Sequence, residues 1–204
     1  MARKRLRIAV IDSGVNPSHP HITRVSGGWV GWPEKDFLDR LGHGTAVMAA
    51  IQEKAPDAEY FAVRIFDREL RTNIETLLAA LQWSMDQDVD IINLSLGTSN
   101  PAHAEKFAPF LSRAIIVSPA GAYPGDLPGV IRVAPDPRCP RDQYRAEGEM
   151  FYASPYPRPM PGVPCEKNLN GVSFAVANMS GLVARACEDL TDRSHKSVRS
   201  KLVG

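Results

Sequence analysis

The chain has 204 residues, 44% of them hydrophobic, and its 24 basic residues nearly balance its 23 acidic ones. This length allows one well-buried core, and we expect a single domain over residues 1–204 with no pro-segment. The formal net charge of +1 argues against a general polyanion-binding protein, so no nucleic-acid partner is expected. No apolar run reaches the roughly 18 residues of a membrane span, and no signal-peptide core follows the basic start. We therefore expect no membrane partner and, by default, a cytoplasmic location.

Short apolar runs alternate with segments of helical spacing along the chain. The runs predict strands over residues 6–11, 59–66, 89–94, 114–118 and 130–134. Helices are predicted over residues 44–54, 73–87 and 104–111. Alternation of this kind favours an α/β fold in three layers, a doubly wound, mostly parallel sheet with helices on both faces.

Three polar residues stand at marked points of this pattern. Asp12 follows the first strand, at the end where open α/β sheets place their sites. His43 lies between two glycines before a helix of small residues, and Ser173 lies where a loop enters an apolar helix. Singly, these patterns are typical of a turn residue, a loop histidine and a helix cap. Together, in the order Asp, His, Ser, they predict a triad in which Asp12 orients His43 and His43 takes the proton of Ser173.

These segments resemble the motifs of the subtilisin-like serine proteases, or subtilases. Residues 8–15 are similar to the Asp motif of that family, residues 42–45 to its His motif and residues 171–175 to its Ser motif. Residues 74–97 resemble the family's helix and substrate-binding edge strand, and residues 197–202 a late helix, so the resemblance spans nearly the whole chain.

The resemblance implies a serine endopeptidase that acts on a peptide or protein substrate through an acyl-enzyme, with no cofactor. The substrate backbone would pair with Ser95, Leu96 and Gly97, a form of β-augmentation, beside a pocket wall at Ala120 and Gly121. The small size favours dedicated processing of a peptide or protein precursor.

The oxyanion region departs from the family pattern. Ala122 stands where the family has an asparagine, and Val172 where it usually has a threonine, so neither side chain can donate a hydrogen bond to an oxyanion. Loss of one such donor costs on the order of 2.7–4 kcal/mol, a magnitude that comes from this family itself. The backbone N–H of Ser173 remains as a donor, and Tyr123, Asn168 or Asn170 could supply another.

This departure leaves alternatives to a peptidase open. The chain could be a catalytically impaired pseudoprotease that binds peptide as a recognition or scaffold subunit, or it could need an activating protein partner. Resolution of the acyl-enzyme by an amine would instead make it a transpeptidase or macrocyclase.

Metal binding is not expected. Residues 52–58 are too few to wrap a calcium ion with 6–8 oxygen ligands, so we expect a calcium-independent chain. His19 and His21 have a His-x-His spacing, which we interpret as part of a structural loop.

The segment over residues 135–164 is rich in proline and lacks a clear period, so we expect an irregular excursion with one short strand at residues 151–153. It is either plain surface or, as the resemblance implies, part of a substrate cleft. Cys139, Cys165 and Cys187 are expected as free thiols, with a Cys139–Cys165 pair as the alternative in an oxidising compartment.

Overall fold

The computed structural model describes residues 5–32, 36–164 and 167–204, and within them eight strands form one sheet. The strands lie in the order β2-β3-β1-β4-β5-β6-β8-β7, and all pairs are parallel except β7 with β8. Their bounds are β1 Arg7–Asp12, β2 Gly27–Val30, β3 Glu59–Arg64, β4 Ile91–Leu94, β5 Ile115–Pro119, β6 Val130–Pro135, β7 Tyr144–Glu147 and β8 Met150–Ala153.

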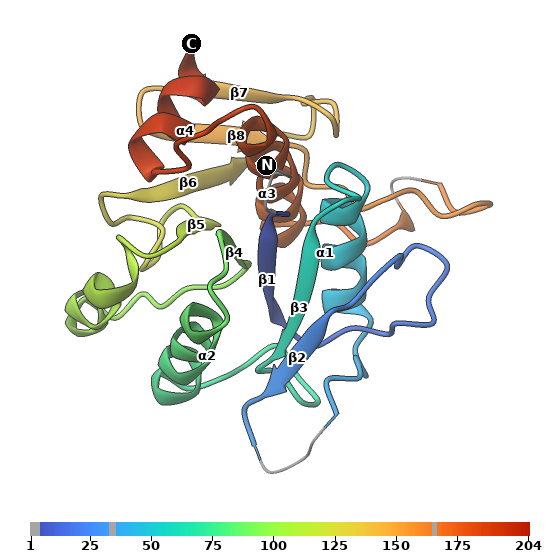
Figure 1. Cartoon of the computed structure of the whole chain (residues 1–204). Coiled ribbons are helices and arrows are strands. Elements are labelled where there is room, and N and C mark those ends of the chain that lie inside the picture. Colours follow the sequence, from blue (N-terminus) through green and yellow to red (C-terminus); the bar gives the residue numbers. More distant parts are fainter. Residues whose placement is uncertain (1–4, 33–35, 165–166) are drawn as a thin grey trace.

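Helices cover both faces of this sheet (Figure 1). One face packs against α1 (His43–Gln52), α3 (Val172–Glu188) and α4 (His195–Val203). The other packs against α2 (Ile74–Asp86) and the 3-10 helix η1 (Pro101–Phe110). The predicted three-layer α/β arrangement is confirmed.

Strand β1 explains why its sequence is apolar at successive positions. Ile8 and Val10 point into the core shared with α1 and α3, while Ala9 and Ile11 point into the core shared with α2. Because β1 lies between β3 and β4, its carboxyl end places Asp12 in the middle of the sheet.

Three segments differ from expectation. Strand β2 was not predicted, because its four residues are all half-buried at a sheet edge and form no apolar run. Residues 135–164 are more regular than their composition suggests, since β7 and β8 form a hairpin that extends the sheet. Helix η1 is a 3-10 helix, and Pro109 within it lacks the amide donor that an α-helix would use there.

Cys187 is buried in α3, and burial raises the pKa of its thiol to about 12. Cys165, and with it the alternative pairing to Cys139, lies outside the described residues. Of the helices in the described ranges, none is long and apolar enough to cross a membrane.

Candidate active site

Asp12 ends β1 with its side chain fully buried. Its Oδ1 accepts two hydrogen bonds, from the backbone N–H of Ser13 and from His43 Nδ1, each at 2.7 Å. Its Oδ2 is also buried and receives no hydrogen bond from the described residues. The imidazole is thus held in one orientation, with Nδ1 toward the carboxylate and Nε2 left for another partner.

His43 is the first residue of α1, and two glycines bring it to Asp12. Gly42 caps the helix in a left-handed conformation at φ 79°. Gly44 lies so close to the backbone of Gly14 that a Cβ would stand 2.2 Å from the Gly14 carbonyl oxygen. The loop after Asp12 and the start of α1 can therefore pack together only without a side chain at position 44.

Charge around His43 favours its protonated form. Burial lowers the pKa of His43, but the hydrogen bond and charge of Asp12, with the charge of Asp39, raise it above its ordinary value overall. The imidazolium that forms when a histidine takes a proton from a nucleophile is stabilised by the same carboxylates.

Asp39 is a site residue that the sequence analysis missed. Its carboxylate accepts hydrogen bonds from the backbone N–H groups of Leu41, Gly42 and Thr45, and from the hydroxyls of Ser13 and Thr45, at 2.6–2.9 Å. It thereby accepts hydrogen bonds from backbone N–H groups at the start of α1, which have no partner within the helix. The available signal was an acidic residue four positions before His43, at the expected start of a helix.

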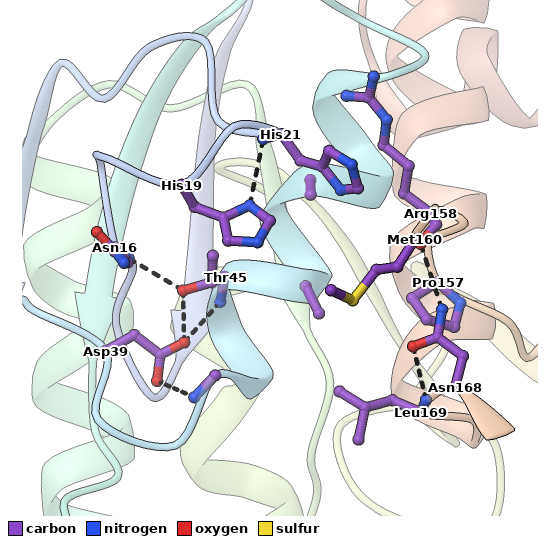
Figure 2. A pocket seen from close by; sticks show the side chains of 13 residues that line it. Asn16, His19, His21, Asp39, Thr45, Pro157, Arg158, Met160, Asn168 and Leu169 are labelled. Carbon is purple, nitrogen blue, oxygen red and sulfur yellow. Dashed lines mark hydrogen bonds between the residues drawn. The ribbon is translucent and has the colours of Figure 1, made fainter. Parts of the chain in front are cut away.

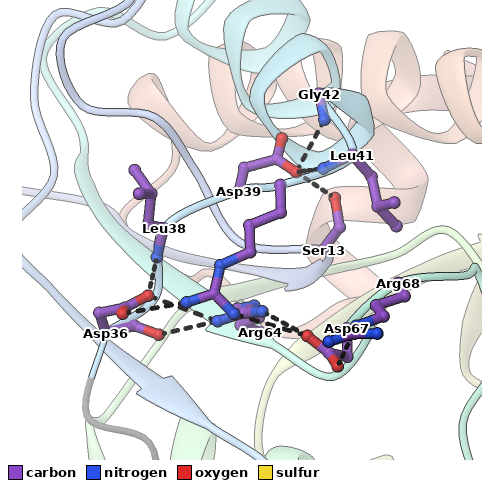
Figure 3. Close-up of polar contacts among 10 residues, drawn as sticks. Ser13, Asp36, Leu38, Asp39, Leu41, Gly42, Arg64, Asp67 and Arg68 are labelled. Atoms are coloured by element: carbon purple, nitrogen blue, oxygen red, sulfur yellow. Dashed lines mark hydrogen bonds and ion pairs between the residues drawn. The ribbon is translucent and has the colours of Figure 1, made fainter.

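The loop that carries Asp39 is also tied to the sheet through Arg64, which is fully buried at the end of β3 (Figure 3). The guanidinium of Arg64 forms ion pairs with Asp67 at 2.8 Å and Asp36 at 3.4 Å. It also lies over the Trp32 ring, 4.8 Å from its centroid. Both ends of the loop before His43 are therefore fixed, one at Asp36 and the other at Asp39.

Ser173 lies in the first turn of α3, beside the end of β4. Its hydroxyl donates to the carbonyl oxygen of Ser95 at 3.4 Å, and the Ser95 hydroxyl donates to the Ser173 carbonyl at 3.3 Å. The next residue, Phe174, packs against the His43 ring with centroids 5.5 Å apart. The structure thus brings all three predicted triad residues to one region, with the serine hydroxyl turned toward Ser95.

Asn93 and Ser180 support this position from within the core. Asn93 Nδ2 donates to the Ser95 hydroxyl, and the Ser180 hydroxyl on α3 donates to Asn93 Oδ1, each at 3.0 Å. All of these polar atoms are buried or half-buried, so the pairing fixes α3 against β4. The sequence offered no sign of it beyond an asparagine within an apolar run.

A family model for the subtilase family matches residues 3–123 of the chain. The chain belongs to the subtilase family. It is 26% identical to subtilisin E of Bacillus subtilis, over 97% of this chain and 59% of that protein. It is also 26% identical to a thermostable alkaline protease of Halalkalibacterium halodurans, over 96% of this chain and 60% of that protein. This subtilase thus spans about three fifths of the length of these two relatives.

Two further proteins match this chain, one over a shorter stretch of sequence and one by its structure. The minor extracellular protease Epr of Bacillus subtilis is 35% identical over 107 residues, which are 48% of this chain and 16% of that protein. The crystal structure of a cold-adapted subtilisin-like serine proteinase matches with a TM-score of 0.76, covering 96% of this chain and 80% of that one, at 17% identity. The structural match supports the fold alone.

The residues predicted to bind substrate follow two neighbouring strands of this subtilase. Ser95, Leu96 and Gly97 follow β4, while Ala120 and Gly121 follow β5. A cavity of about 500 Å³ lies along Leu96, Gly97 and the N-terminal turn of α2. An extended peptide could therefore lie along the backbone of residues 96–99.

The two segments also contact each other. Backbone hydrogen bonds of 2.9 Å join Thr98 and Tyr123 in both directions. A Cβ at Gly97 would stand 2.7 Å from the Ala122 side chain, so only glycine fits there. The space between Gly97 and Ala122 is correspondingly narrow.

The side chains considered as alternative oxyanion donors are packed in a core, hydrogen-bonded elsewhere or exposed to solvent. Tyr123 packs against the core beneath α2, and Asn168 uses its side chain on the Arg158 carbonyl and the Leu169 N–H. Asn170 is exposed. Val172 begins α3 and packs on the other core.

The His-x-His pair forms a local contact. His19 Nδ1 accepts the backbone N–H of His21 at 3.2 Å, and the two rings meet edge to face with centroids 5.1 Å apart. Within the described ranges, no group of three or more His, Cys, Asp or Glu side chains is placed to hold a metal ion.

Proposed function

We propose that this subtilase is a serine endopeptidase in which Asp12 orients His43, His43 is the general base and Ser173 is the nucleophile. The observation that carries the proposal is the 2.7 Å hydrogen bond from His43 Nδ1 to the buried Asp12, near Ser173 in the first turn of α3. The membership of the subtilase family supports the same assignment.

The reaction follows from this arrangement. Rotation of the Ser173 side chain away from the Ser95 carbonyl brings its hydroxyl to His43 Nε2, which takes the proton as Oγ attacks the peptide carbonyl. The imidazolium then gives that proton to the leaving amine, which leaves an acyl-enzyme for water to hydrolyse. The backbone N–H of Ser173, at the positive end of the α3 dipole, faces the developing oxyanion.

The substrate is proposed to be a peptide or protein precursor, bound antiparallel along Ser95, Leu96 and Gly97 next to Ala120 and Gly121.

A second candidate is a binding protein that does not cut. Ala122 and Val172 both lack a donor, and the Ser173 hydroxyl is turned toward Ser95, which favours a pseudoprotease or a chain that requires an activating partner. Aminolysis of the acyl-enzyme, as in a transpeptidase, is a variant of the first candidate.

Cleavage of a defined peptide mixture separates these candidates. The purified chain and its Ser173→Ala variant are incubated with peptides that vary at every position, and the products are read by mass spectrometry. New termini that depend on Ser173 support the peptidase. Peptide binding without any new terminus supports the pseudoprotease, and glycinamide adducts in the presence of added glycinamide support aminolysis.

A further inference from the structure

A second cavity, of about 270 Å³, lies against the outer face of α1 (Figure 2). Thr45, Ala46 and Ala49 of α1 form its floor. Its walls come from the turn after Asp12, over residues 16–21, and from residues 157–160 and 168–169 of the segment before α3. It begins at Gly42, the residue before His43, and shares no lining residue with the cavity along Leu96.

One end of this cavity carries hydrogen-bond donors and positive charge. His19 Nδ1 accepts a hydrogen bond, so the neutral ring carries its proton on Nε2. Figure 2 shows the Arg158 side chain reaching toward His21, and in the described residues its guanidinium makes no hydrogen bond or ion pair. Burial lowers the pKa of His21, and the charge of Arg158 lowers it further.

The two acidic groups near the cavity in the described part of the chain, Asp39 and Glu53, already have partners. Asp39 lines it, but five donors occupy its carboxylate. Glu53, which acts on His21 from the end of α1, is paired with Arg141 and Lys54. Among the residues that the structure describes, Arg158 is therefore the charged group on the cavity wall that is available to a ligand.

The other end of the cavity is apolar and open to solvent. Met160 and Leu169 are 45% and 49% exposed, which is high for such side chains, and Pro157 lies beside them. An apolar surface with a few convergent polar groups is typical of a ligand site. At about 270 Å³ the cavity suits a side chain and its neighbour better than a whole small-molecule ligand.

The place of the cavity relative to His43 indicates which part of a peptide would reach it. A general base that accepts the serine proton later gives it to the leaving amine, so the leaving part of the substrate passes by the imidazole. The cavity starts at Gly42, one residue before His43, whereas the cavity along Leu96 lies beside the segment after β4 that would hold the acyl part.

We infer that the cavity binds the leaving-group side of a peptide substrate through an acidic side chain. Arg158 and the imidazole N–H groups of His19 and His21 hold the carboxylate, and Met160 and Leu169 hold an adjacent apolar side chain. The assignment to the leaving-group side rests on the proposed function, but binding of an acidic peptide does not.

Binding to the uncleaving Ser173→Ala chain tests this inference. The probes are two dansylated pentapeptides, Ala-Leu-Glu-Leu-Ala and Ala-Leu-Gln-Leu-Ala, whose affinities are measured by fluorescence anisotropy at fixed ionic strength. The glutamate peptide should bind at least about tenfold more tightly, as a charge-assisted hydrogen bond provides. Arg158→Gln should remove that preference, whereas Arg138→Gln, at an exposed arginine on another loop, should leave it.

A second variant tests the cavity itself. Ala46→Leu narrows the floor and should weaken both peptides, while far-UV circular dichroism and thermal melting confirm that each variant is folded. Equal affinities for the two peptides, no binding of either at 1 mM, or a preference that survives Arg158→Gln would overturn the inference. If the preference depends on Arg158 but no peptide is ever cleaved, the cavity remains an acidic-peptide site and the peptidase proposal fails alone.

Discussion

Single side chains set the pKa of His43, and the carboxylate of Asp39 is one that does so without a direct contact. Asp39 does not touch the imidazole, yet its charge adds to that of Asp12 in raising the pKa of His43. It also holds the loop and the first turn of α1 through five hydrogen bonds. We therefore regard Asp39 as a positioning residue for the base.

The pH dependence of cleavage follows from this pKa. His43 must be neutral to accept the Ser173 proton, so kcat/KM should rise with pH through the pKa of His43, with a midpoint above 6.5. Asp39→Asn removes a charge that raises this pKa and should move the midpoint to lower pH. Asp67→Asn, whose carboxylate pairs with Arg64 instead, serves as the control. A midpoint that is the same in Asp39→Asn and in the unmodified chain would contradict the electrostatic role.

Ala122 stands where the family has an asparagine side chain that can donate to the oxyanion. If the oxyanion has lost a side-chain donor, Ala122→Asn should raise kcat by up to about 10²–10³-fold, the magnitude known from subtilisin. Ala122→Leu has a similar size without a donor and should give no gain. Progress curves on one cleaved peptide measure both. A kcat for Ala122→Asn no higher than for Ala122→Leu would show that another group already serves the oxyanion.

At the scale of elements, α1 and α3 carry the base and the nucleophile at their N-terminal turns and pack against each other. A buried lysine, Lys54, lies at their contact, where its Nζ donates to Asn178 Oδ1 at 2.7 Å and to the Ala50 carbonyl at 3.1 Å. Gly181 leaves room for its side chain. Burial, together with the charge of Arg141, lowers the pKa of Lys54 to about 8.

This buried cation makes stability depend on pH. Between the folded pKa of about 8 and the unfolded value near 10.5, the unfolded chain binds more protons, so the free energy of unfolding rises with pH. Compared with Lys54→Met, the unmodified chain should gain on the order of 2 kcal/mol between pH 8 and pH 10. Urea titrations measure this, with the exposed-site variant Lys106→Met as the control. A parallel pH dependence of unmodified chain and Lys54→Met would contradict a strongly lowered pKa.

In the molecule as a whole, the connection between α1 and β3 is short. Only residues 53–58 join α1 to β3, so we expect no calcium site there. A calcium site with a dissociation constant of about 10 μM would add about 2.7 kcal/mol at 1 mM calcium. The melting temperature should therefore be the same after dialysis against EDTA and after addition of 1 mM calcium chloride. An increase of several degrees on calcium addition would contradict this.

The sequence was sufficient for the parts of the fold that are governed by apolar patterns. The run at residues 6–11 places Asp12 at a strand end, and the spacing of Ile74, Leu77, Leu81 and Met85 predicts α2, because burial alone decides both. Strands β2 and β7 were not predicted, since strands at the edges of a sheet need little apolar character, and β8 was predicted only over residues 151–153.

The candidate site was predictable only as far as its motifs. Asp39, Asn93 and the cavity at Arg158 depend on which polar atoms the tertiary fold brings together, and residues such as Arg158 and Gly42 are 116 positions apart in the chain. No local pattern encodes such contacts. The pairing of Gly44 with Gly14 illustrates the same point, because the small residues are visible in the sequence but their close approach is not.

The most direct measurement for the proposed mechanism is intact-mass spectrometry after incubation with a fluorophosphonate probe near neutral pH. We predict a single adduct, on Ser173, that His43→Ala and Ser173→Ala both abolish, because only an activated serine attacks phosphorus at a useful rate. Absence of any adduct on the folded chain, or an adduct that persists in Ser173→Ala, would contradict the assignment of Ser173 as the nucleophile.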